Sequence, residues 1–285
     1  MFEKGSVQKV SEGSTALQAN GDINITNGLS AADVIQIFDI LFQNQFPKLQ
    51  QVAKEQAIKN SKEFEAIVIN DLHTNSEKII IEKFKDPDVQ ALLNDALMST
   101  ARKGRKSHPD LLSRLIVEKV SAGNSDFQDI VLTEAVDIIP KLTKEHIVFI
   151  CGVFILKQLV MQISLGEVLY LIERFHIQFE KDFGINFNLS EANLNHISYT
   201  GACNINQLMG MDVVESFIVK YKMFGCGDLK AGEFKLKALA PVTYRFLERI
   251  NTPIVGGVYL TSVGQAIAIT ALHKLLPLEY STWIS

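Results

Sequence analysis

The residue types that most often carry enzyme chemistry occur in this chain without the spacing that such chemistry needs. The histidines are scattered, at His73, His108, His146, His176, His196 and His273. None belongs to a His-Glu-x-x-His pair or lies at ligand spacing from a cysteine, as a zinc site requires. Cys151, Cys203 and Cys226 are an odd number without paired spacing, which indicates buried thiols in a reducing compartment. No metal ion and no cofactor is expected.

Nucleophile signatures are also absent from the sequence. There is no Gly-x-Ser-x-Gly elbow and no glycine-rich phosphate loop, and Cys226 has no identified partner histidine to act as its base. Several carboxylates share one predicted helix with Arg174 and Lys181: these are Glu167, Glu173, Glu180 and Asp182. The spacing favours a solvated, salt-bridged face over paired catalytic acids. The sequence therefore favours a protein without enzymatic activity.

One dense basic run, Arg102-Lys103-Gly104-Arg105-Lys106, stands where a predicted helix ends. Cations complement the negative end of a helix, so a helix terminus with Gly104 as its left-handed residue explains the run most simply. Phosphate binding is the alternative, although no aromatic residues are interleaved for base stacking. The candidate nucleic-acid contacts are Arg102, Lys103, Arg105 and Lys106, together with Arg245 and Arg249 of a later helix.

The overall composition is that of a folded globular protein, with 47% hydrophobic and 21% charged residues among 285. The net charge of −4 argues against a surface that attracts nucleic acid everywhere. The first ten residues contain no secretory signal, so the cytoplasm is the expected location. Residues 147–163 are strongly apolar but include Lys157, and they predict a buried core helix. A membrane is not expected as a partner.

The elements that would position these residues begin with a short β-forming head at residues 14–25. Asn20-Gly21 is a strong hairpin signal, because both residues tolerate positive φ. The flanking segments are only four to five residues long, and an isolated strand pair of that size is marginally stable in water. A β-hairpin or β-arch that needs partners is therefore predicted.

The body is predicted to be mainly α. Val34, Ile37, Phe38, Leu41 and Phe42 recur with helical spacing from Ser30 onward, and this helix is expected to end near Phe46-Pro47. Further helices are predicted at residues 48–71, 75–84, 86–102, 108–121 and 126–139. Another is predicted to begin at Thr143, and two more are predicted at residues 165–182 and 190–200.

The C-terminal quarter predicts a small α+β module. Phe234, Leu236 and Ala238 alternate with lysines as in a half-buried strand, and a helix follows from Pro241. A hairpin at 254–259 and a final helix capped by Ser262 complete an order that is typical of winged-helix modules. The predicted domains are residues 1–28, 29–204 and 205–285.

Both ends of the chain resemble an uncharacterised family of bacterial cytoplasmic proteins. The head is similar to a GGDINI-type β motif that precedes a helical body in that family. The residues that carry this similarity are Gln18-Ala19-Asn20-Gly21-Asp22-Ile23-Asn24-Ile25. The ending, Tyr259-Leu260-Thr261-Ser262-Val263-Gly264 with the closing Trp283-Ile284, is similar to the terminal LTxxG…WI signature. A related ending occurs in abortive-infection proteins of the alpha type. The resemblance implies a bacterial origin and a role in phage defence, and it implies no catalytic residues.

The favoured hypothesis is a non-enzymatic, self-associating protein in which heads of several chains share a β core. The residues expected at this homo-oligomer contact are Leu17, Asn20, Gly21, Asp22, Ile23 and Ile25. One alternative is a nucleic-acid-binding protein that uses the C-terminal module and the basic run. Another is a membrane-acting effector that exposes residues 147–163.

Overall fold

The computed structural model describes residues 31–160, 165–206, 210–221, 224, 228–252 and 254–284; for residues 31–49 and 165–168 it describes the backbone alone. The predicted β head, and with it the predicted oligomer contact, lies outside the described residues. The chain divides into two units, one up to Ala53 and the other from Lys54 onward. The prediction of a mainly α fold is confirmed.

Helix α1 (Ala31–Thr74) is a single helix of 44 residues. The predicted end near Phe46-Pro47 is wrong. A proline inside a helix removes one hydrogen bond, here to the carbonyl of Gln43, and the rest of the hydrogen-bond ladder can continue on either side.

The part of α1 from Lys54 onward belongs to the second unit and packs on it through one face. Phe64 is buried, and Asn60 Nδ2 donates to the carbonyl of Ala101 at 3.0 Å. Further along, the Ser113 hydroxyl donates to Asp71 at 2.7 Å. Ile58 and Ile69 stay exposed. This stretch is therefore only partly buried.

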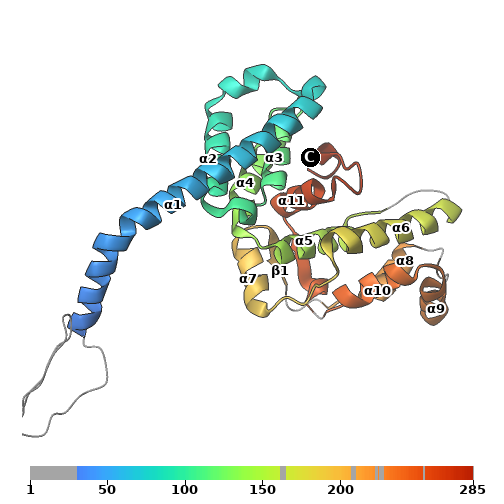
Figure 1. Ribbon diagram of the computed structural model, residues 1–285. Coiled ribbons are helices and arrows are strands. Elements are labelled where there is room, and N and C mark those ends of the chain that lie inside the picture. Colours follow the sequence, from blue (N-terminus) through green and yellow to red (C-terminus); the bar gives the residue numbers. More distant parts are fainter. Residues whose placement is uncertain are drawn as a thin grey trace, which may run out of the picture. The chain divides into compact units, whose positions relative to one another are not determined.

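Helices α2 (Pro87–Lys103), α3 (Pro109–Lys119) and α4 (Asp126–Ile138) form one end of the second unit (Figure 1). Ser125 and Gln128 form a capping box at the start of α4, which satisfies two otherwise unpaired backbone N–H groups. Residues 75–84, predicted as a helix, instead form 3-10 turns. The four short 3-10 segments in this region are η1 (Ser76–Lys78), η2 (Ile81–Lys85), η3 (Gly104–Ser107) and η4 (Ile139–Lys141).

Helix α5 (Lys144–Lys157) runs through the core, and every residue from His146 to Leu156 is buried. A helix that is apolar all round is expected to be buried on all sides. Helix α11 (Ser262–Leu272) packs along it. The prediction of a core helix is confirmed for residues 147–156. Among the described residues, no helix has both the length and the apolarity to cross a membrane.

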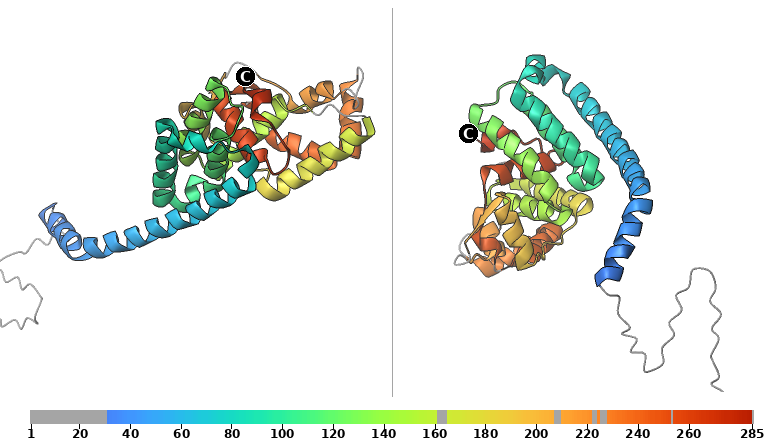
Figure 2. Two further views of the ribbon diagram at one scale, coloured as in Figure 1. Left: turned by 90° about the horizontal axis from the view of Figure 1, so that it is seen from above. Right: turned by 90° about the vertical axis from the view of Figure 1, so that its left-hand side faces the viewer.

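The other end of the second unit contains α6 (Leu165–Phe183) and three shorter helices. Figures 1 and 2 show α6 lying along α10 (Pro241–Ile250), and α8 (Val213–Lys220) and α9 (Leu229–Leu239) also contact α10. The remaining helices are α7 (Glu191–Tyr199), which is capped by Ser190, and α12 (Tyr280–Trp283).

Three predictions for the C-terminal quarter are wrong, the first of them that Ser262 is a helix cap, since the N-cap residue of α11 is Thr261. Residues 234–238 lie in α9, where Leu236 is buried one turn after Gly232 and Phe234 is 76% exposed, a helical rather than an alternating pattern. Instead of forming a hairpin, residues 254–259 pass through η5 (Val255–Gly257) into β2 (Val258–Leu260). Strand β2 pairs antiparallel with the distant β1 (Cys203–Ile205). The order on which the winged-helix prediction rested is not found in the described residues.

Candidate interaction surfaces

The first candidate surface belongs to the unit that ends at Ala53. Its described part is the first half of α1, whose sequence carries the apolar stripe Val34, Ile37, Phe38, Leu41 and Phe42. The helical backbone over these residues matches the period that the sequence predicted, and residues at this spacing share one helix face. An amphipathic helix needs a second apolar surface against which to bury such a stripe.

The second candidate surface is the basic run, which stands at the end of α2. Helix α2 ends at Lys103 and its C-cap residue, Gly104, has a positive φ of +55°, so the predicted helix terminus is confirmed. A Cβ at this position would meet the amide of Asn60 in α1 at 3.1 Å. The four basic side chains of the run are exposed.

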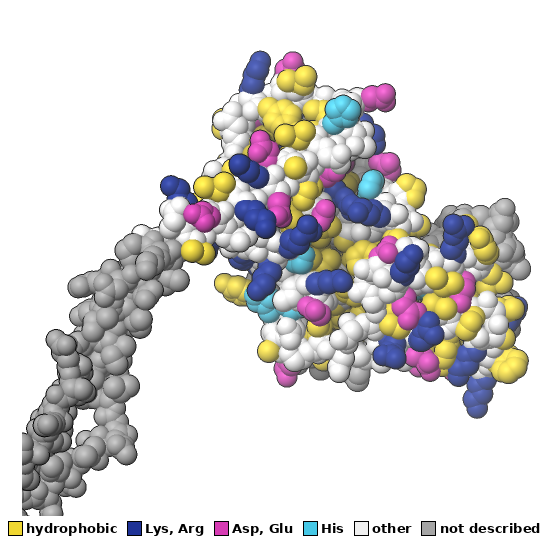
Figure 3. All heavy atoms as spheres, viewed as in Figure 1, with side chains coloured by type: hydrophobic (Ala, Val, Ile, Leu, Met, Phe, Trp, Pro, Cys, Tyr) yellow, Lys and Arg dark blue, Asp and Glu magenta, His cyan; other side chains and the backbone are white. Residues whose placement is uncertain are grey.

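Two hydrogen bonds bring this run against the turn between α4 and α5. Lys103 Nζ donates to the carbonyl of Pro140 at 2.6 Å, and His108 Nε2 lies 2.9 Å from the carbonyl of Leu142. Lys141, in η4, therefore lies beside the run, and the exposed Lys144 begins α5 three residues later. We call these residues the cationic face: Arg102, Lys103, Arg105, Lys106, Lys141 and Lys144. Figure 3 shows Lys and Arg side chains gathered over this part of the molecule, with some Asp and Glu side chains among them.

Arg245 and Arg249, the other predicted nucleic-acid contacts, are not part of the cationic face. Both lie on α10, which packs against α6, α8 and α9. Arg245 Nη2 lies 2.6 Å from Glu180 Oε2 of α6, so its charge is already paired within the chain. The structure therefore separates the six predicted residues into two groups.

Glu173 has a different role from the solvated position that the sequence indicated. Its carboxylate accepts hydrogen bonds from the backbone N–H groups of Val242 and Thr243, at 2.8 and 2.9 Å, and from the Thr243 hydroxyl. It caps the N-terminus of α10 from the neighbouring helix α6. The N-cap residue of α10 is Ala240, which has no side chain able to cap. This alanine before Pro241 was the signal in the sequence that a cap must come from elsewhere.

His176 is the most deeply enclosed histidine of this region. Its Nδ1 lies 2.8 Å from the carbonyl of Ile172, and its ring centroid is 4.5 Å from that of Phe246. Its Nε2 is buried without a hydrogen-bond partner. Burial lowers the pKa of His176 to about 4, so the ring is neutral at ordinary pH. His176 is therefore a neutral residue of the core.

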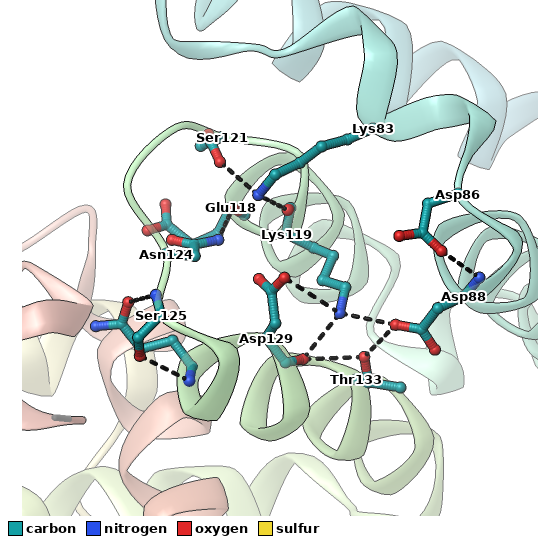
Figure 4. Close-up of polar contacts among 11 residues, drawn as sticks. Lys83, Asp86, Asp88, Glu118, Lys119, Ser121, Asn124, Ser125, Asp129 and Thr133 are labelled. Carbon is teal, nitrogen blue, oxygen red and sulfur yellow. Dashed lines mark hydrogen bonds and ion pairs between the residues drawn. The ribbon is translucent and has the colours of Figure 1, made fainter.

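A buried ammonium group fixes α2, which ends in the cationic face, against its neighbours (Figure 4). Lys119 Nζ at the end of α3 lies 2.8 Å from Asp88 in α2, and it donates to the carbonyl of Asp129 in α4 at 3.0 Å. Lys83 Nζ binds the carbonyls of Lys119 and Ser121, which ties η2 to the end of α3. These contacts hold α2, α3 and α4 together.

The class that these features define is a helical protein with a long N-terminal helix and no group of His, Cys, Asp or Glu among the described residues that could hold a metal ion. A protein-family model described as ":-like" matches residues 28–238. The match covers more than half of the 285 residues, so the chain belongs to that family. No curated protein and no solved structure matches the chain.

Proposed function

We propose that this is a self-associating protein without enzymatic activity, whose N-terminal segment joins copies of the chain. The observation that carries the proposal is α1: it runs unbroken through Pro47, and its residues up to Ala53 belong to a separate unit. Each large apolar side chain left in water forgoes about 1.5 to 3 kcal/mol of burial free energy. The five stripe residues therefore favour association with another apolar surface.

A second copy of the same segment is the partner that the sequence supports best. Amphipathic helices bury such stripes against each other in bundles. The predicted hairpin at 14–25 has the same need, because its strands are too short to be stable alone. The resemblance to abortive-infection proteins supports placing this association in bacterial phage defence, in the cytoplasm.

Light scattering on three forms of the protein tests the proposal: the full chain, residues 29–285 and residues 54–285. The shortest form keeps the core of the second unit and should fold as a monomer, whereas the full chain should be an oligomer. An oligomer of unchanged stoichiometry from residues 54–285 would overturn the proposal. If residues 29–285 form the same oligomer as the full chain, the head is not needed for association and α1 is the contact.

The cationic face supports a second candidate function, the binding of nucleic-acid phosphates. The observation in its favour is the contact of Lys103 with Pro140, which adds Lys141 and Lys144 to the four residues of the run. Without aromatic residues for base stacking, the contacts would be to the backbone, and binding would depend strongly on salt and weakly on sequence.

Fluorescence anisotropy with a labelled DNA duplex at two salt concentrations tests this second function. Changing Lys106 and Lys141 to glutamate should weaken binding at low salt by at least tenfold, because phosphate contacts are lost. The same change should also reduce the dependence of binding on salt. The matched control changes the exposed Lys230 and Lys235 of α9 to glutamate and leaves the net charge the same. Equal loss in both double variants, or no binding by the unaltered protein at low salt, would contradict a specific role for the cationic face.

A further inference from the structure

A cavity of about 400 Å³ lies between the end of α5, one face of α8 and the segment from Gly256 to Tyr259. Its apolar wall contains Leu156, Val213 and Phe217, all of which are buried. Its polar groups include two lysines, Lys157 and Lys220. A mostly apolar cavity of this size with a few fixed polar groups is typical of small-molecule sites.

The two lysines are held in place by backbone carbonyls. Lys157 Nζ donates to the carbonyl of Gly256 at 2.7 Å and lies 4.0 Å from the ring centroid of Tyr259. Lys220 Nζ donates to the carbonyl of Leu156 at 3.0 Å. An ammonium group has three N–H donors, so each keeps donor capacity beyond its carbonyl. Both cations are therefore positioned without being saturated.

These charges lack a counter-ion in the described part of the chain, where no Asp or Glu pairs with either ammonium group. Burial lowers the pKa of Lys157, and it lowers that of Lys220 to about 8. A partly buried cation without an anion is costly, and a bound anion relieves that cost. The negative end of the α5 dipole disfavours a bound anion. Its charge is only about half an elementary charge, whereas the two lysines carry two positive charges.

We infer that this cavity binds a small organic anion, whose acidic group is held by Lys157 and Lys220 and whose apolar body packs against Phe217 and the neighbouring wall. Ser216 adds a neutral hydroxyl at the same cavity. The inference is independent of self-association, because all the residues involved lie in the second unit.

Isothermal titration calorimetry on the full chain with naphthalene-2-sulfonate tests the inference. This probe combines one permanent negative charge with an aromatic body, and it should bind at least tenfold more tightly than the neutral naphthalene-2-sulfonamide or the small anion methanesulfonate. Equal affinity for the sulfonate and the sulfonamide would overturn the inference, as would the absence of sulfonate binding at millimolar concentration.

The variants Lys157→Gln and Lys220→Gln remove the charges and keep a side-chain donor for the carbonyls. Each should weaken sulfonate binding by about tenfold to a hundredfold, the usual cost of losing a hydrogen bond to a charged group. Lys230→Gln on α9, outside this cavity, is the control and should bind like the unaltered protein. Unchanged binding in both cavity variants would show that the probe lies elsewhere and would overturn the inference.

The pH dependence gives a second readout that a merely structural role would not produce. The titratable side chains that line the cavity with Lys220 are Lys157 of α5 and Tyr259 of β2. Sulfonate affinity should be constant well below pH 8 and fall as the pH rises through 8, because Lys220 loses its proton there. The Lys220→Gln variant should lose this fall, and its persistence in that variant would count against Lys220 as the contact.

Discussion

Lys119 carries a charge into the interface of three helices, where only 6% of its side chain is exposed. Its partners are Asp88, whose side chain is 54% exposed, and Asp129, whose Oδ1 is buried without a hydrogen-bond partner. Removing one member of a buried ion pair leaves the other charge uncompensated, which is the costly part of such a change. This residue therefore matters more for stability than its single short ion pair suggests.

We expect Lys119→Met to lower the free energy of unfolding by about 2 to 3 kcal/mol, less than for a fully buried pair because Asp88 is partly solvated. Urea unfolding followed by circular dichroism measures the change. Lys85→Met, at an exposed position of η2, is the control and should change the free energy by less than about 0.5 kcal/mol. A loss of that small size in Lys119→Met would contradict this account of the network.

His176 predicts a dependence of stability on pH. Burial holds its folded-state pKa near 4, below the ordinary value of 6.5, so the unfolded chain binds the proton more readily. The stabilising contribution of the neutral ring is complete above about pH 6.5 and is lost as the pH falls toward 4.

The corresponding loss is about 3 kcal/mol, since each pKa unit corresponds to about 1.4 kcal/mol. Unfolding measured at pH 7 and at pH 4.5 should show a larger decrease for the unaltered protein than for His176→Leu. Because the other titrating groups are the same in both proteins, the difference isolates His176. An equal decrease in both proteins would show that this ring does not carry the effect.

At the scale of elements, the cap that α6 provides for α10 is a specific device of this fold. We expect Glu173→Ala to cost about 1 to 2 kcal/mol, as for other lost N-caps, because two backbone N–H groups lose their acceptor. Glu180→Ala, on the same helix, removes only the exposed pair with Arg245 and should cost less than about 1 kcal/mol. Thermal unfolding of the two variants compares them, and an equal cost would argue against the cap.

Sequence patterns predicted the elements whose signals are local. The period of the apolar residues lies within each helix, the start of α5 at Thr143 is marked by the residues next to it, and α5 is apolar enough to predict its burial. The prediction of a strand at 234–238 was wrong because a short alternation of apolar residues and lysines also fits a helix, in which only Leu236 of these five residues is buried. The prediction of a hairpin at 254–259 was wrong because β2 pairs with β1, which is distant in the chain.

The candidate surfaces follow the same division between local and distant signals. The four basic residues at 102–106 were visible as a run, whereas Lys141 and Lys144 join them only through the contact of Lys103 with Pro140. The cavity with Lys157 and Lys220 gave no sequence signal, since its walls come from three separate segments. Such sites depend on tertiary contacts that spacing in the sequence does not show.

At the scale of the whole molecule, helix α1 runs from one unit into the other, and we propose different roles for the two units. The second unit has a continuous core that includes Phe154, Phe179 and Phe246, and it carries the cationic face and the cavity. The unit up to Ala53 offers the apolar stripe of α1, which suits contact with other chains. In this account the N-terminal unit brings copies together, and the second unit supplies whatever they bind.

Sedimentation velocity on full-length variants of α1 tests self-association most directly. Phe38→Asp combined with Leu41→Asp places two charges in the stripe, and Gln36→Asp combined with Gln43→Asp adds the same charge at positions on the opposite side of the helical period. We predict an oligomer for the unaltered protein and the control, and a shift to the monomer for the stripe variant. An oligomer of unchanged size in the stripe variant, or a monomeric unaltered protein at every concentration, would contradict the account.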